Sequence, residues 1–365
     1  MREIKVALVG CGFVANDHLR AWKKVREARV VAVSDLNENA VTKTAELWKI
    51  PHYYKSFSEL IEQNEIDLVD ICTPPQTHAS LAVQAMKAGF HILLEKPMAL
   101  DLKDAKKIAQ CQKATGQKGG VIHNWLFEPT VLNATSLIEK GRLGEVISLE
   151  VEVLHTKYDH MVANEHHWCH GSQGGRFSEM LAHPIYLTRH FLGEVKIGDV
   201  RVSKIGGYAW MKSDELCATF KSGEKLGRIY ISFNAPRDEI FIGLHGREAI
   251  LQLNMINATT SLLPKREVSR FSKGFDALRQ ATQLLKSTTR NVAKIASGSW
   301  LSGHEMCIKL FTQSLIRDSE PPVTIEDGYR VVKVLEEICE RIGIAEYTRI
   351  KPPIRQTDSG THYRR

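Results

Sequence analysis

Residues 5–15 read KVALVGCGFVA, a short apolar run that leads directly into a glycine-rich turn. The pattern is GxGxxA, with Gly10, Gly12 and Ala15 at its fixed positions. The first glycine permits a tight turn, the second lets the backbone approach a pyrophosphate, and the small third residue lets a helix pack closely on the strand. A helix over about residues 14–25 would offer its N-terminal amides to a diphosphate. This stretch predicts the start of a dinucleotide-binding βαβ unit.

A second apolar run, over about residues 29–34, ends at Asp35. Asp35 lies 23 residues after Gly12, close to the spacing at which an acidic side chain accepts hydrogen bonds from the adenosine ribose hydroxyls. A carboxylate there repels a 2′-phosphate, so the sequence favours NAD over NADP. The alternative is a solvated aspartate that opens a turn.

Strands and helices continue to alternate through the first third of the chain. Buried strands are predicted over residues 67–72, 91–95 and about 120–123, with helices over residues 78–88, ending at Gly89, and 102–115, with Asp101 as N-cap. Alternation at this pace predicts an α/β fold, here a Rossmann domain over residues 1–123 with a doubly wound, parallel sheet.

Length and composition restrict the class of protein. A chain of 365 residues exceeds what one core usually spans, so two domains are expected. The net charge of +7 without a strong basic block favours an anionic ligand and no nucleic acid. The seven scattered cysteines lack a CxxC pair, as in a reduced, cytoplasmic protein. Neither a signal peptide nor an apolar run of membrane-spanning length is found, so no membrane span is expected.

The tripeptide Glu95-Lys96-Pro97 follows the apolar run at residues 91–94. Open α/β sheets place their ligands at this end of their strands, so Lys96 can meet both a cofactor and a substrate. A solvated loop lysine is the alternative.

With these motifs in order, the chain resembles the Gfo/Idh/MocA family, named for glucose–fructose oxidoreductase, inositol dehydrogenase and a rhizopine catabolism protein. The similarity covers about residues 4–345. The residues that carry it are GCGFVA at 10–15, Asp35, Thr73-Pro74-Pro75 with His78, Glu95-Lys96-Pro97, His123-Asn124 through Pro129, and GRLGEV at 141–146.

The resemblance implies a C-terminal α/β domain with an open, mainly antiparallel sheet, assigned to residues 124–345 and followed by a polar tail over residues 346–365. It also implies a carbohydrate substrate and a homodimer or homotetramer formed through that sheet. The positions that it assigns to the cofactor are Gly10, Gly12, Phe13, Val14, Asp35, Thr73, Pro74, His78, Glu95, Lys96 and Asn124.

A second motif begins at the glycine pair 174–175 and opens a helix that is predicted to run to about residue 192. Glu179 and His183 are four residues apart, so they share one face of that helix. The family pattern has Asp where Glu179 stands, and many members carry a further Asp where this chain has Tyr186. Pro184 removes an amide donor inside the helix and predicts a kink beside His183.

These residues suit the oxidation of a secondary alcohol, which needs a base for the hydroxyl proton while a hydride leaves the carbon. His183 is the natural base, and Lys96 can stabilise alkoxide character on the same oxygen. Glu179 would orient the imidazole or hold a neighbouring hydroxyl. Which of Lys96 and His183 takes the proton is left open. Substrate contacts are assigned to Lys96, Trp168, Arg176, Glu179 and His183.

Two further segments admit more than one interpretation. Residues 155–170 contain five histidines and Cys169, but their spacing does not match a zinc module, so no metal is predicted and Trp168 is expected to stack on a sugar ring. The basic segment 275–296 is interpreted as a solvated helix face, with contact to a sugar-nucleotide diphosphate or a membrane surface as the alternative.

Three functions remain. The first is an NAD-dependent dehydrogenase of a sugar, polyol or nucleotide sugar. The second keeps NAD tightly bound and recycles the hydride in a lyase, glycosidase or epimerase reaction. The third is a non-catalytic NAD-binding regulator, which the joint presence of Lys96, Glu179 and His183 disfavours.

Overall fold

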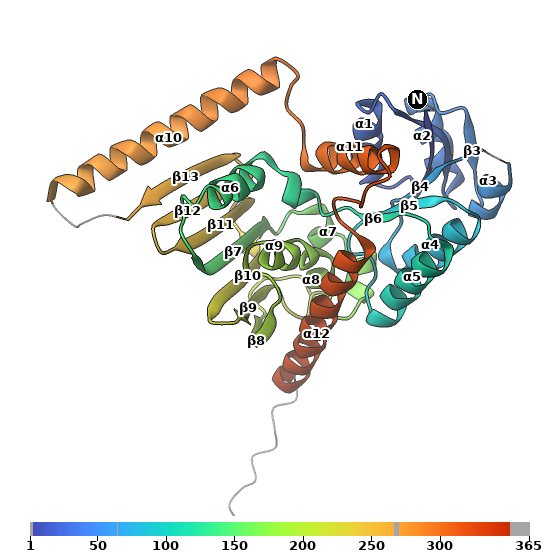
Figure 1. The fold of residues 1–365 in the computed structure, drawn as a ribbon. Helices are drawn as coiled ribbons and strands as arrows, with labels where there is room; N and C mark the ends of the chain where they lie inside the picture. The colour runs from blue at the N-terminus through green and yellow to red at the C-terminus, as the bar shows by residue number, and fades with distance from the viewer. Residues whose placement is uncertain (1–2, 64, 266–269, 351–365) are drawn as a thin grey trace, which may run out of the picture.

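Two β-sheets with surrounding helices make up the protein (Figure 1). The computed structural model describes residues 3–63, 65–265 and 270–350.

The first sheet is parallel throughout. Its strands are β1 (Ile4–Val9), β2 (Ala28–Ser34), β3 (His52–Tyr54), β4 (Leu68–Ile71), β5 (His91–Leu94) and β6 (Gly119–Val121). They lie in the order β3-β2-β1-β4-β5-β6. The order reverses between β1 and β4, which is where such sheets open a crevice for a ligand. The predicted doubly wound sheet is confirmed.

Helices cover both faces of this sheet, as parallel strands require. They are α1 (Ala15–Lys23), α2 (Glu38–Trp48), α3 (Phe57–Gln63), the short 3-10 helix η1 (Pro75–Thr77), α4 (His78–Lys87) and α5 (Leu102–Thr115). Residues 6–9 of β1 are at most 4% exposed. Asp101 caps α5 as predicted, because its carboxylate accepts a hydrogen bond from the Asp104 amide at 2.8 Å.

The second sheet is open and mainly antiparallel. Its strands are β7 (Val146–Thr156), β8 (Lys196–Ser203), β9 (Glu215–Ser222), β10 (Lys225–Ala235), β11 (Glu239–Gly246), β12 (Ala249–Asn254) and β13 (Thr259–Pro264), in the order β13-β12-β11-β7-β10-β9-β8. β7 and β10 are parallel and the other neighbours antiparallel. β13 and β8 are the edge strands and therefore pair on one side alone.

Helices that precede and follow β7 along the chain include the two that carry the second motif. They are η2 (Asn124–Phe127), α6 (Pro129–Glu139), α7 (His160–Ala163), η3 (Trp168–Gly171), α8 (Arg176–Met180) and α9 (Ala182–Leu192). The helix predicted from the glycine pair to residue 192 is interrupted at Leu181. Pro184 has no amide hydrogen for the carbonyl of Met180, which explains the interruption.

The C-terminal part of the chain returns to the first sheet. α11 (Gly303–Ile316) buries Cys307, Ile308 and Phe311 in the same hydrophobic cluster as β4 and β5. α12 (Ile325–Ile350) follows α11 and is the last helix of the described residues. The first five residues of the predicted polar tail therefore belong to α12, and residues 351–365 lie outside the described residues.

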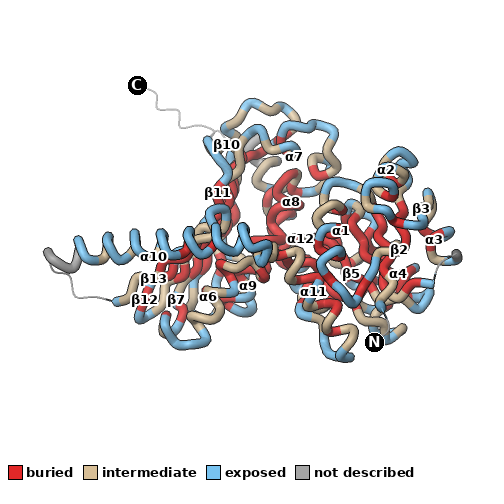
Figure 2. The backbone as a smooth tube through the Cα atoms, turned by 90° about the horizontal axis from the view of Figure 1, so that it is seen from above, coloured by how far each residue is buried: buried red, intermediate tan, exposed pale blue. Residues whose placement is uncertain are grey.

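The basic segment forms most of α10 (Arg270–Ala296), a long helix beside β13 at the edge of the second sheet (Figures 1 and 2). Its polar side is the one that meets the sheet. Gln283 bonds the amide and the carbonyl of Leu262, at 2.8 and 3.1 Å. Leu278, Leu285 and Val292 are 60 to 67% exposed, and the basic Arg279, Lys286, Arg290 and Lys294 are exposed with them, so the outer side carries both apolar and basic side chains. Among the described residues, no helix combines the length and the apolar character needed to cross a membrane.

Candidate active site

The glycine turn after β1 is shaped for close approach of a ligand. Gly10 has φ +95°, and a Cβ added there would lie 2.8 Å from the backbone of Cys72 and Thr73. A Cβ on Gly12 would meet nothing within 4 Å, and Gly12, Phe13 and Val14 line an open cleft. The turn therefore fits a dinucleotide pyrophosphate at the N-terminus of α1.

Asp35 stands at the end of β2, next to this turn. Its carboxylate accepts hydrogen bonds from the backbone amides of Cys11 at 2.7 Å and Asn37 at 2.8 Å. The side chain is thus held beside the glycine loop, in the place where a ribose would be bound.

The loop after β4 contributes Thr73 and Pro74 to the cleft. His78, predicted to contact the cofactor, has no exposed surface and lies beneath this loop. Its Nε2 is 2.8 Å from the Thr73 carbonyl, and its Nδ1 is 3.3 Å from that of Met98. Burial lowers the pKa of His78. His78 therefore supports the loop, and its prediction as a cofactor contact is corrected.

Lys96 extends from the end of β5 to Glu179 of α8. Its ammonium forms an ion pair with Glu179 Oε1, and the Arg176 guanidinium pairs with Oε2 of the same carboxylate. Burial alone would raise the pKa of Glu179, but the charges of Lys96 and Arg176 hold it well below its usual range. Glu179 was predicted to orient His183 or hold a hydroxyl. Its two oxygens bind these two cations, which reach them from the strand end and from the preceding helical turn.

His183 is held by aromatic neighbours. Its ring stacks on Trp125 with centroids 4.1 Å apart, and its Nδ1 lies 2.7 Å from the hydroxyl of Tyr186. Burial and the nearby Lys96 charge hold the pKa of His183 well below its usual value. The imidazole is therefore neutral near pH 7 and has a lone pair available to accept a proton.

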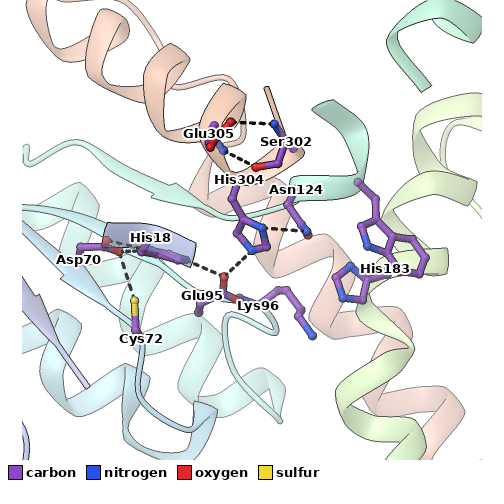
Figure 3. A network of polar contacts seen from close by, with 12 residues as sticks. His18, Asp70, Cys72, Glu95, Lys96, Asn124, His183, Ser302, His304 and Glu305 are labelled. Carbon is purple, nitrogen blue, oxygen red and sulfur yellow. Dashed lines mark hydrogen bonds and ion pairs between the residues drawn. The ribbon is translucent and has the colours of Figure 1, made fainter. Parts of the chain in front are cut away.

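A buried polar network behind Lys96 includes residues to which the sequence analysis assigned no role (Figure 3). The Glu95 carboxylate contacts His18 Nε2 at 2.9 Å and His304 Nε2 at 3.5 Å. His18 Nδ1 lies 2.8 Å from Asp70. Burial alone would lower the pKa of His18, but the Asp70 carboxylate raises it well above its usual value. His18 is thus an imidazolium between two carboxylates.

Two groups of described side chains lie close enough together to hold a metal ion: His18 with Asp70 and Cys72, and His18 with Glu95 and His304. Both include His18, whose two ring nitrogens already contact carboxylates. Neither contains a histidine of the segment 155–170.

The histidine-dense segment forms one wall of the cleft instead, through His155, Asp159, His160, Met161, His167 and Trp168. Arg176 also lines it, over the ring of Phe233 at 5.1 Å. The cleft therefore joins the glycine loop, Lys96, Asn124, Glu179, His183 and His304 in one space.

The fold and the cleft define a dinucleotide-binding α/β protein, and comparison with protein families specifies its family. A model described as an oxidoreductase family with an NAD-binding Rossmann fold matches residues 4–123, and one for the C-terminal alpha/beta domain of that family matches residues 135–342. The chain belongs to the Gfo/Idh/MocA oxidoreductase family.

Relatives include oxidoreductases and sugar dehydrogenases. "Oxidoreductase P35" of Formosa agariphila is 27% identical over 268 residues, which are 71% of this chain and 82% of that protein. D-apiose dehydrogenase of Paraburkholderia graminis is 30% identical over 145 residues, or 40% of this chain and 38% of that enzyme.

The fold is shared with a solved structure of the WlbA dehydrogenase from Bordetella pertussis in complex with NADH and UDP-GlcNAcA. The TM-score is 0.76 at 20% identity, with 93% of this chain and 96% of that chain covered. At this identity the comparison establishes the fold.

Proposed function

We propose that the protein is an NAD-dependent dehydrogenase that transfers a hydride between a secondary alcohol of a sugar, polyol or nucleotide sugar and the nicotinamide. The observation that carries the proposal is one cleft with the glycine loop on one side and Lys96, Glu179 and His183 on the other.

Gly10, Gly12 and Asp35 would hold the dinucleotide, which when bound supplies the carbon that accepts or donates the hydride. Asp35 favours NAD, because its carboxylate would repel the 2′-phosphate of NADP.

The side chains opposite the glycine loop divide the acid–base work. His183 accepts the hydroxyl proton, since its imidazole is neutral and lines the cleft. Lys96 donates a hydrogen bond to the same oxygen and stabilises its negative charge. Arg176 pairs with the second oxygen of Glu179, so both oxygens of this buried carboxylate have a cationic partner.

The carbohydrate class is supported by the sugar dehydrogenases among the relatives and by Trp168 in the cleft wall, where an indole can stack on a sugar ring. We also propose a cofactor domain over residues 1–123 and a substrate domain over 124–345. A homodimer or homotetramer would form through the second sheet, where Ile147, Phe241 and Ile250 are 37 to 42% exposed. Seven free cysteines suit a cytoplasmic location.

The test is a panel of free sugars, inositols and UDP- or dTDP-sugars, assayed with NAD for NADH formation and for thermal shift. We expect at least one compound to give both. Protein that copurifies with NAD, converts a substrate and releases no NADH would instead indicate the hydride-recycling function. Binding of NAD without conversion of any compound would support the regulator.

A further inference from the structure

A continuous chain of polar contacts links the buried carboxylate of Glu95 to the imidazole of His183. Figure 3 shows its first part, in which His304 lies between Glu95 and Asn124. The second part runs from Asn124 through the hydroxyl of Tyr186 to His183. His304 is delivered by α11 and Tyr186 by α9, and nothing in the family motifs assigns either a role.

Because Glu95 is ionised, it determines which partner donates the proton in its contact with His304. Burial alone would raise its pKa, but hydrogen bonds from His18 and His304 hold it well below the usual range. A carboxylate accepts hydrogen bonds and donates none. The ring nitrogen of His304 that faces Glu95, Nε2 at 3.5 Å, must therefore carry the proton. A histidine ring whose single proton is on Nε2 has its lone pair on Nδ1.

The side-chain amide of Asn124 donates at one end and accepts at the other, so it continues the same order of donors and acceptors. Its Nδ2 lies 3.4 Å from His304 Nδ1 and donates to that lone pair. The opposite end of the amide is therefore the oxygen, and it accepts from the hydroxyl of Tyr186 at 3.3 Å. The flipped amide would place its oxygen against the His304 lone pair, so the Glu95 charge decides the orientation.

The hydroxyl of Tyr186 has one proton, which it donates to the side-chain oxygen of Asn124. Its oxygen accepts the Trp125 amide at 2.9 Å and has a second lone pair left. The 2.7 Å contact with His183 must then be a hydrogen bond from Nδ1–H to the phenol oxygen. The proton of neutral His183 is thus on Nδ1, and Nε2 has the lone pair.

We propose that Tyr186, Asn124 and His304 are positioning residues that hold His183 in the Nδ1–H tautomer and so present Nε2 as the proton acceptor. The catalytic consequence rests on the proposed dehydrogenase function, whereas the tautomer is a property of the protein without substrate.

The first test is independent of any reaction. Protein with 15N-labelled histidine is observed by long-range 1H–15N NMR, and His183 is assigned by the signals lost in His183→Gln. We expect the Nδ1–H pattern in the wild type. An Nε2–H pattern would overturn the proposal, whether or not the protein proves to be a dehydrogenase.

Variants then test whether the chain causes the tautomer. Tyr186→Phe keeps the ring that stacks on His123 but removes the hydroxyl, and His304→Leu removes the link to Glu95. Both are expected to move His183 toward Nε2–H. Tyr230→Phe is the matched control, because that hydroxyl bonds Glu215 in the second sheet. An unchanged tautomer in folded Tyr186→Phe contradicts the proposal.

Kinetics provide a separate readout once a substrate is known. Tyr186→Phe should lower kcat roughly 10- to 100-fold with little change in KM, since the wrong tautomer of a general base slows the chemical step and not binding. Because the residues act in series, the double variant Tyr186→Phe/His304→Leu should be no slower than the single Tyr186→Phe variant. Multiplicative losses would show that His304 acts independently and would reject the chain.

Discussion

The two sides of the cleft are built in different ways. The cofactor side is made of backbone: a glycine turn, a helix N-terminus and loops that follow neighbouring strands. The opposite side is made of charged and aromatic side chains from distant segments, such as Lys96, Glu179 and His304. A site made of backbone tolerates substitution of most side chains but not a change in the shape of the turn. A site made of side chains loses its arrangement when any one of the paired residues is replaced. The variants below test that difference.

Lys96→Met should cause the largest loss. Turnover should fall roughly a thousandfold, because the donor to the developing alkoxide is removed while a side chain of similar length remains. NAD affinity, measured by fluorescence titration, should change little. Lys204→Met is the control, since Lys204 also pairs with a buried carboxylate, Asp214, but lies outside the residues that line the cleft. Full turnover in the Lys96 variant would remove Lys96 from the mechanism.

Gly10→Ala should weaken NAD binding about 100-fold, because the new Cβ would lie 2.8 Å from backbone atoms and the turn would have to move. The control is Gly89→Ala. Gly89 has a similar φ of +93° but open space around its added Cβ, so that variant carries the backbone strain without the collision. Equal NAD affinities in the two variants would show that strain alone, and not the shape of the turn, is responsible.

Asp35→Ser should change cofactor preference by about tenfold toward NADP, since the repulsion of a 2′-phosphate is relieved at a partly exposed position. The ratio of Kd values for NAD and NADP measures it. Glu38→Gln removes a nearby exposed carboxylate outside the glycine loop. If both variants shift the ratio equally, overall charge matters and Asp35 has no specific role.

The free energy of unfolding should depend on pH in one direction through Glu95 and Glu179 and in the opposite direction through His18. The folded pKa values of Glu95 and Glu179 lie below the reference value of 4.5, so their stabilisation is present above that pH and is lost as the pH falls. The raised folded pKa of His18 has the opposite sign: its contribution is present below 6.5 and is lost as the pH rises through the folded value.

Thermal melting between pH 3 and 9 measures both the loss of stability at low pH and the loss at high pH. Glu179→Gln should lower Tm at pH 7, because Arg176 loses a buried partner, and should make the fall below pH 4.5 shallower. An acid limb that is unchanged in Glu179→Gln would mean that other groups control it.

The sequence predicted the strand–turn–helix start of the Rossmann sheet and the cap of α5 because their signals are local. The glycine turn, Asp35 and the Asp101 cap each depend on neighbouring residues or on a short βαβ unit. For the opposite side of the cleft, the sequence named several of the residues but did not predict which of them form pairs. Spacing placed Glu179 and His183 on one helix face, yet the partner of Glu179 is set by Lys96, 83 residues away.

His304 illustrates the limit further. It lies 180 residues from Asn124, and the local pattern around it indicates the start of a helix: Ser302 and Glu305 form a capping box. Nothing within that pattern shows that the helix returns to the first sheet, where it packs against α1. Tyr186 stands out in the sequence because the family pattern often has Asp at this position. The sequence does not show that its partners are Asn124 and His183.

The return of α11 to the first sheet bears on how this protein could be recombined with its relatives. Added Cβ atoms at Gly119 and Gly120 would lie 2.7 Å from Ile325 and Phe311, so β6 and the C-terminal helices fit each other through two missing side chains. A chimera joined at residue 123 would inherit a cofactor domain from one parent and its covering helix from another. Successful exchange would require α11 and the start of α12 to travel with the glycine loop, and His304 would travel with them.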